Sequence, residues 1–415
     1  MERRWTWTAL LATTALLSSG AAWTEELSFG QVERGQYLVE AGDCQACHTN
    51  ASGQPFAGGR PIQTPFGVIY SPNITPDRDT GIGAWTDDQF YRAMHQGVAA
   101  DNDYLYPAFP YTWYTKVTRD DVLAIRAYLN TLDPVRAERK PNDLDWPLNH
   151  RSVMRGWNDL FFKEGELSPN PGKSAEWNRG AYLVEGLGHC GACHTPTNVL
   201  GAAKTGEPLQ GGTLQNWYAP SLAADLRSGL GSWSKADIVE FLKTGRNAST
   251  AAYGPMSEVI TYSTSKLNDG DLEAIATYLK DVPAPAPAKT PAKLDPKVAQ
   301  AGQAIYIDNC SACHKSNGEG VPGTFPPLKG DAAAQGGDPT TVIRVILDGA
   351  HAVATDARPT PVSMPTFRWK LSDQEIAAVA SYVRSAWGNA AAAVSAADVQ
   401  SMRLALDPPK SAAAR

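Results

Sequence analysis

The stretch Cys44-Gln45-Ala46-Cys47-His48 recurs twice in this 415-residue chain, as Cys190-Gly191-Ala192-Cys193-His194 and as Cys310-Ser311-Ala312-Cys313-His314. The three copies contain all six cysteines of the protein. Cys-x-x-Cys-His is the attachment sequence of c-type haem. Two thiols one helical turn apart add to the vinyl groups of one porphyrin, and the histidine supplies a nitrogen to the iron. The pattern therefore predicts three covalently bound haem c groups, with Cys44, Cys47, Cys190, Cys193, Cys310 and Cys313 as attachment residues and His48, His194 and His314 as proximal iron ligands.

Two other uses of paired cysteines fit this sequence less well. A structural zinc site needs four sulfur or histidine ligands close together, and no second half-site lies near any copy. A thioredoxin-like redox pair belongs to a βαβ context, which the sequence lacks.

The sequence around each motif also repeats. Arg34-Gly35-Gln36-Tyr37-Leu38-Val39-Glu40 precedes the first motif, Arg179-Gly180-Ala181-Tyr182-Leu183-Val184-Glu185 the second and Ala301-Gly302-Gln303-Ala304-Ile305-Tyr306 the third. Each indicates a helix that runs into its motif. Closing helices are predicted over 118–129, 267–279 and 371–383, with Thr118, Asn268 and Ser372 as N-caps. Middle helices are predicted over 85–97, 233–245 and 342–349.

These repeats predict an all-α fold of three tandem class I cytochrome c-like domains, each around a covalent haem that substitutes for a large hydrophobic core. We call them the first unit (27–140), the second unit (175–283) and the third unit (298–389). Residues 141–174 are apolar enough to form a packed linker, and 284–297 form a Pro/Ala linker. Residues 390–415 are predicted to be a mobile C-terminal tail, or one that docks on a partner.

The N-terminus has the pattern of a secretory signal peptide. Arg3 and Arg4 precede an apolar run over 5–17, and small residues follow as far as Ala22. We predict a signal peptide over 1–22 and a location in the periplasm, peripheral to the outer face of the cytoplasmic membrane. The alternative is an uncleaved anchor, but the run is short for a bilayer. The net charge of −6 provides no basic surface for nucleic acid.

Two methionines are candidates for the distal iron ligand. A methionine sulfur closes the iron and raises its reduction potential, which suits electron transfer. Met256 lies before the closing helix of the second unit, and Met364 lies at the same place in the third unit. We predict both as distal ligands, the alternative being that each fills a gap in the core.

The first unit departs from this pattern, because Phe109 stands where the sulfur is expected and cannot bind iron. Met94 and His95, on the predicted middle helix, are the nearby candidates. Counted back from the glycine that ends each middle helix, Met94 matches Leu242 and Ile346, so this position is apolar in all three units. Met94 is therefore the predicted distal ligand, with His95 or an open iron as alternatives; His95 would lower the potential of that haem.

The remaining histidines and the twelve tryptophans are predicted to be structural or solvated. His189, directly before Cys190, is expected to be a solvated side chain, the alternative being a contact with a haem propionate.

The chain resembles the triheme cytochrome c subunit of bacterial membrane-associated dehydrogenases, which include alcohol, gluconate, sorbitol and aldehyde dehydrogenases and molybdenum hydroxylases. The resemblance rests on the three motifs, the Arg-Gly-x-Tyr-Leu-Val-Glu segments, and the segments 71–77, 81–85 and 105–108. It implies a catalytic dehydrogenase partner that carries a quinone, flavin or molybdopterin cofactor. It also implies ubiquinone or a terminal oxidase as the acceptor, and peripheral membrane association. Many members have Tyr-Pro-Ala-Met-Pro in the loop that contains Phe109, so this residue is a departure from the family.

The predicted function is therefore electron transfer by a non-catalytic subunit of an oxidoreductase complex. No acid–base pair, nucleophile or phosphate loop in the sequence competes for this role. Two alternatives are a haem enzyme with an open first haem and a free-standing periplasmic electron shuttle.

Overall fold

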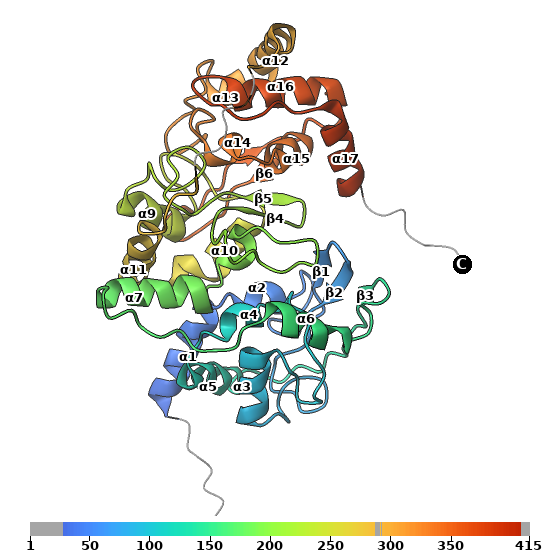
Figure 1. Cartoon of the computed structure of the whole chain (residues 1–415), viewed down its shortest axis with the longest axis vertical. Coiled ribbons are helices and arrows are strands. Elements are labelled where there is room, and N and C mark those ends of the chain that lie inside the picture. Colours follow the sequence, from blue (N-terminus) through green and yellow to red (C-terminus); the bar gives the residue numbers. More distant parts are fainter. Residues whose placement is uncertain (1–27, 287–290, 292, 408–415) are drawn as a thin grey trace, which may run out of the picture.

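The computed structural model describes residues 28–286, 291 and 293–407. The predicted signal peptide and parts of the Pro/Ala linker and C-terminal tail lie outside these residues. The three units follow one another along the long axis of the molecule, from the blue first unit to the orange and red third unit (Figure 1).

The helices and strands occur in a similar order in each unit. The first unit contains α1 (Phe29–Ala41), α2 (Cys44–His48), β1 (Pro61–Thr64), β2 (Gly67–Tyr70), α3 (Asp87–Gln96), α4 (Tyr111–Tyr114) and α5 (Arg119–Leu129). The second unit contains α7 (Ala175–Tyr182), a π-helical turn (Leu183–Leu187), α8 (Gly191–His194), β4 (Gly212–Leu214), β5 (Trp217–Ala219), α9 (Lys235–Thr244), α10 (Pro255–Tyr262), a 3₁₀ turn (Thr264–Lys266) and α11 (Asp269–Leu279). The third unit contains α12 (Pro296–Asn309), α13 (Ser311–His314), α14 (Ala332–Gln335), α15 (Thr340–Asp348), β6 (Ala350–His351), β7 (Ser363–Met364) and α16 (Asp373–Ser385).

In every unit the first helix packs against the closing helix, as α1 on α5, α7 on α11 and α12 on α16. One glycine allows each pair to approach closely. A Cβ atom on Gly35, Gly180 or Gly302 would lie 1.9, 2.0 or 2.3 Å from a backbone carbonyl oxygen of the closing helix. The glycine shared by the three repeats is therefore required by the helix crossing.

The predicted closing helices and their caps are confirmed. The side chains of Thr118, Asn268 and Ser372 each accept a hydrogen bond from the backbone N–H three residues later. This contact satisfies a donor that the first turn of a helix leaves unpaired.

The prediction of an all-α fold was incomplete, because the described residues also contain seven short strands. β1 and β2 form an antiparallel hairpin in the first unit, and β4 and β5 form one in the second. Gln215 and Asn216, which connect β4 to β5, have φ of 50° and 59°. Two consecutive residues with positive φ form the turn that a tight hairpin prefers. The hairpins were missed because these strands are only three or four residues long.

The first and second units share one hydrophobic core, which includes residues from Leu38 to Val282. Reciprocal polar contacts join the same two units. The hydroxyl of Tyr37 donates to Asp271 Oδ2 at 2.6 Å, and the hydroxyl of Tyr182 donates to Asp121 Oδ2 at 2.6 Å. Each aspartate is also bound by an arginine of its own unit, Asp271 by Arg179 and Asp121 by Arg34. In the Arg-Gly-x-Tyr segment, the arginine therefore makes a contact within its own unit and the tyrosine makes a contact with the other unit.

The third unit has a core of its own and lacks this arginine and tyrosine. It joins the second unit by contacts of a different kind. Tyr218 of β5 donates its backbone N–H to Thr341 Oγ1 at 2.8 Å, and the Arg344 guanidinium lies over the Trp217 ring at 4.2 Å. The first two units thus form one body, to which the third is attached by such polar contacts and by a small apolar cluster of Ala252, Ile260 and Val353.

The linker over 141–174 packs on the first unit, in line with its apolar content. Its helix α6 (Val153–Phe161) buries Met154, and Asn158 accepts a 2.5 Å hydrogen bond from the Tyr111 hydroxyl. Its short strand β3 (Asp143–Leu144) pairs with β2.

The prediction of a mobile tail from residue 390 was wrong for the residues up to 407. They contain α17 (Ala396–Leu406), which packs on α15 and α16 and buries Val399 and Met402. Ser395 and Asp398 form a capping box at the start of this helix, a signal that was present in the sequence.

Candidate functional site: three haem-attachment motifs

Each Cys-x-x-Cys-His motif forms a single helical turn, in α2, α8 and α13. Residues three and four positions apart lie on the same face of a helix. The two cysteines of a motif and the histidine that follows them therefore point to one side. This is the arrangement that two thioether bonds and a proximal nitrogen on one porphyrin require.

The three motif histidines are held in the same way. The Nδ1 atoms of His48, His194 and His314 lie 2.8, 2.6 and 2.9 Å from the backbone carbonyl oxygens of Pro72, Pro220 and Pro326. A carbonyl accepts the proton on Nδ1, so Nε2 is left with its lone pair. Burial lowers the pKa of all three imidazoles, which favours the neutral form that binds a metal.

None of the six cysteines is paired in a disulfide. Burial is the main cause that raises the pKa of Cys44, Cys190 and Cys193 to about 12, and that of Cys47 and Cys310 to about 11. A structural zinc site needs four sulfur or nitrogen ligands close together. In the described part of the chain no group of three or more His, Cys, Asp or Glu side chains is placed to hold a metal ion. Each motif offers two sulfurs and one histidine nitrogen, which is the donor set of a covalent haem and is incomplete for a structural zinc site.

The third unit brings its predicted ligands together in one cavity. Cys310, Cys313, His314 and Met364 all line it, and Val342, Val345 and Ile346 of α15 form an apolar wall. The proximal histidine and the candidate distal sulfur thus face the same enclosed space. An apolar lining with a few ligating groups is the environment that a porphyrin needs.

Met256, the distal candidate of the second unit, lies in the first turn of α10. It packs against the core shared by the first two units, and also against the small cluster of Ala252, Ile260 and Val353. Its loop reaches the third unit as well, because Tyr253 lines the same cavity as His314.

The structure separates the two candidates in the first unit. Met94 is buried in the core, at the repeat position of Ile346, which lines the cavity of the third unit. His95 matches Leu347, which is fully buried and is not among the residues of that cavity. The His95 ring stacks on Tyr91 at 4.8 Å and its Nε2 lies 3.4 Å from Glu164 Oε1, while its Nδ1 is buried without a partner among the described residues. Met94 therefore shares the repeat position of a residue that lines a cavity, and His95 does not.

The first and second motifs lie close to each other. Cys47 of the first motif is near enough to Cys193 of the second to contribute to its raised pKa. The backbone of Asp43, directly before the first motif, has a φ of 52°, and that of His189, directly before the second, has a φ of 38°. The two attachment turns therefore share both an unusual conformation and an interface.

The comparison with known proteins agrees with this geometry. The cytochrome c family matches residues 32–133 and 299–387. The chain is 41% identical over 411 residues to the gluconate 2-dehydrogenase cytochrome c subunit of Pantoea cypripedii, with 93% of this chain and 92% of the relative covered. It belongs to the cytochrome c subunits of bacterial dehydrogenases.

Two further relatives support this membership. The cytochrome c subunit of the quinone-dependent alcohol dehydrogenase of Gluconobacter oxydans is 39% identical, with 97% of this chain and 88% of the relative covered. The cytochrome subunit of the fructose dehydrogenase of Gluconobacter japonicus is 39% identical, with 90% of this chain and 82% of the relative covered.

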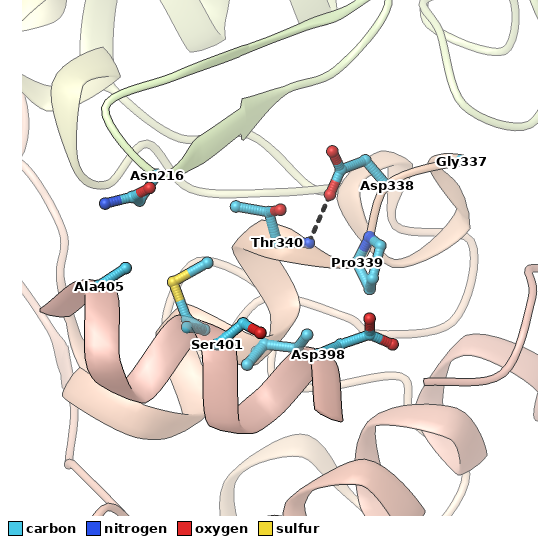
Figure 2. A pocket seen from close by; sticks show the side chains of 10 residues that line it. Asn216, Gly337, Asp338, Pro339, Thr340, Asp398, Ser401 and Ala405 are labelled. Carbon is cyan, nitrogen blue, oxygen red and sulfur yellow. Dashed lines mark hydrogen bonds between the residues drawn. The ribbon is translucent and has the colours of Figure 1, made fainter. Parts of the chain in front are cut away.

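A second cavity of this cytochrome c subunit lies away from the motifs (Figure 2). Its walls come from Asn216 after β4, the segment 337–343, and α17. Both of its carboxylates are already bound, since Asp338 accepts from the Thr340 N–H at 2.8 Å and Asp398 caps α17. The lining contains no cysteine or histidine, so this cavity is not a haem-attachment site.

Sequence reasoning missed the side chains between the motifs of this cytochrome c subunit. His189 was expected to be solvated, but its ring lies against the Tyr114 ring with centroids 5.3 Å apart, and burial lowers its pKa. Tyr114 and Tyr253 carry no motif, and their roles depend on contacts between units. A repeat pattern in the sequence describes each unit by itself and contains no signal for such contacts.

Proposed function

We propose that this protein carries three haem c groups in three tandem class I cytochrome c domains and transfers single electrons for a catalytic dehydrogenase. The observation that carries the proposal is the threefold motif geometry, in which each histidine is fixed through Nδ1 and offers Nε2 on the same helical turn as two cysteines. A bound haem iron would cycle between the ferric and ferrous states and so hold one electron.

The protein's own residues have separate tasks in this function. The cysteine pairs fix the porphyrin, and the prolyl carbonyls of Pro72, Pro220 and Pro326 set the orientation and basicity of the histidines. Apolar walls such as that of α15 exclude water, and a low-polarity surrounding is one of the factors that set the reduction potential.

Met256 and Met364 are the proposed distal ligands of the second and third haems. Met94 is the proposed distal ligand of the first, with His95 as the alternative. The Met94→Ala variant tests this assignment. We expect it to lose one third of the near-infrared sulfur-to-iron absorption while the other two haems are unaffected. An unchanged band would exclude Met94, and loss of a low-spin signal in His95→Ala instead would favour the histidine.

The positions of the motifs support an electron path from unit to unit. The first and second motifs are linked by the contact of Tyr114 with His189, the residue before Cys190. The loop that carries Met256 also places Tyr253 in the cavity of the third motif. The haem of the second unit would thus lie between the other two.

The proposed partner is a catalytic dehydrogenase subunit, because the relatives are named as subunits of gluconate, alcohol and fructose dehydrogenases. The proposed acceptor is ubiquinone or a terminal oxidase. The proposed location is the periplasm, at the outer face of the cytoplasmic membrane, to which the signal peptide would direct the chain. Within the described residues no helix is long and apolar enough to span a bilayer.

Purification of the tagged, exported protein from its own cells tests the function. We expect it to co-purify with a larger dehydrogenase, and we expect its haems to become reduced when the substrate of that dehydrogenase is added. A haem-loaded protein that purifies alone and is reduced by no such complex would favour the free-standing shuttle.

A further inference from the structure

Tyr114 lies between the first two motifs and contacts residues next to both of them. Its side chain is 5% exposed, and its hydroxyl donates to the carbonyl oxygen of Gly42 at 3.0 Å, in the turn that leads into the first motif. Its ring contacts Phe109, the residue at the distal position of the first unit, with centroids 5.4 Å apart. Gly42 lies two residues before Cys44, so Tyr114 is placed beside the entry to the first motif.

The same ring reaches across to the second motif. Its edge packs on His189, the residue before Cys190, with a centroid separation of 5.3 Å and an interplanar angle of 72°. The His189 backbone is left-handed, with φ of 38°, and Nδ1 lies 3.1 Å from the Leu187 carbonyl oxygen. The neighbouring Trp113 is equally close to this motif, since a Cβ on Gly191 would lie 2.7 Å from its Nε1.

This contact couples the attachment turns of two units through one rigid pair of rings. Aromatic rings have only two side-chain torsions, and both are fixed here by burial and by hydrogen bonds at Gly42 and Leu187. Movement of one motif relative to the other would have to break this packing. The pair therefore determines the distance and orientation between whatever groups the two motifs hold.

We propose that Tyr114 and His189 are positioning residues for direct electron exchange between the first and second haems. The proposal rests on the proposed haem attachment. One electron moves per step, so that one iron changes from ferrous to ferric and the other from ferric to ferrous, and no bond or proton is transferred. Tyr114 and His189 would fix the two attachment turns relative to each other, and so would keep the separation of the bound haems constant.

Pulse radiolysis of the full-length, fully oxidised protein tests the proposal. A pulse that delivers less than one electron per chain is followed by redistribution among the haems, at a rate independent of protein concentration. We expect Tyr114→Leu and His189→Leu to slow one intramolecular phase several-fold, because the rate of electron tunnelling falls as the distance between the two haems increases. Tyr114→Phe keeps the ring contact and should retain the wild-type rate.

Tyr111→Leu is the matched control, because Tyr111 is a buried tyrosine of the same helix that binds Asn158 of α6. It should leave both intramolecular phases unchanged. If Tyr114→Leu does not retain three haems, the rate measured with His189→Leu tests the proposal, because this variant removes the same contact from the side of the second unit. The proposal is overturned if the leucine variants contain three haems and redistribute electrons at the wild-type rate, or if Tyr111→Leu slows the same phase equally. Absence of haem from the wild-type protein would instead refute the proposed function, before any kinetic measurement.

Discussion

Replacing Gly35 with alanine should destabilise the first two units, because the added methyl group has no room. Its Cβ would lie 1.9 Å from the Ala124 carbonyl oxygen, whereas an ordinary contact is at least 3.4 Å. Helices α1 and α5 would have to separate by about 1.5 Å. An extra methyl in a packed core costs about 1–3 kcal/mol, and the upper value applies because a backbone carbonyl cannot rotate away.

Part of this cost is offset by the better helix propensity of alanine, which contributes about 1 kcal/mol. The net loss should be about 2 kcal/mol, equivalent to a melting temperature lower by about 4–8 °C for a body of this size. Thermal unfolding followed by circular dichroism measures it in the haem-loaded protein.

Gly30→Ala is the control in the same helix, since a Cβ there meets nothing within 4 Å. It should melt at the wild-type temperature or slightly above. Equal melting temperatures for Gly35→Ala and Gly30→Ala would refute the helix-crossing argument. Gly302→Ala should affect the separate core of the third unit in the same way.

Three further predictions concern the interfaces and the distal ligands. Burial raises the pKa of Asp271, but hydrogen bonds from Arg179 and Tyr37 outweigh burial, so the pKa in the folded state is lowered. Asp271→Asn should therefore lower the free energy of unfolding by about 2 kcal/mol at neutral pH. This stabilisation is present above the unfolded-state pKa of about 4 and is lost as the pH falls through the folded-state pKa. The denaturant midpoints of the wild type and of Asp271→Asn should therefore converge in acid. A difference between the two midpoints that does not change with pH would contradict the ion pair. Met364→Ala should abolish the near-infrared band of one haem and lower one midpoint potential, and an unchanged redox titration would exclude this ligand. A fragment that ends at residue 282 should fold with two haems, since the first two units share one core, and haem loss or aggregation on gel filtration would contradict that division.

The sequence alone predicts the elements that depend on local signals. The motif helices, the Thr118, Asn268 and Ser372 caps and the glycine that ends α3 are all encoded within a few residues. The α17 helix carried the same kind of signal in Ser395 and Asp398, and was missed because its alanine-rich flank suggested a tail.

The contacts between units could not be predicted in this way. The pairing of Tyr37 with Asp271 spans 234 positions, and nothing near either residue specifies its partner. The sequence also contains no signal for which side of a middle helix lines a cavity; in the third unit Ile346, the counterpart of Met94, lines it and Leu347, the counterpart of His95, does not. The place of His189 likewise depends on Tyr114, a residue of another unit.

The intact mass of the exported, mature protein, measured under denaturing conditions, tests the central claim most directly. Covalent attachment at all three motifs predicts a chain heavier than its polypeptide by three haem groups, with no free thiol remaining. A chain of polypeptide mass, or one with six titratable thiols, would contradict the account.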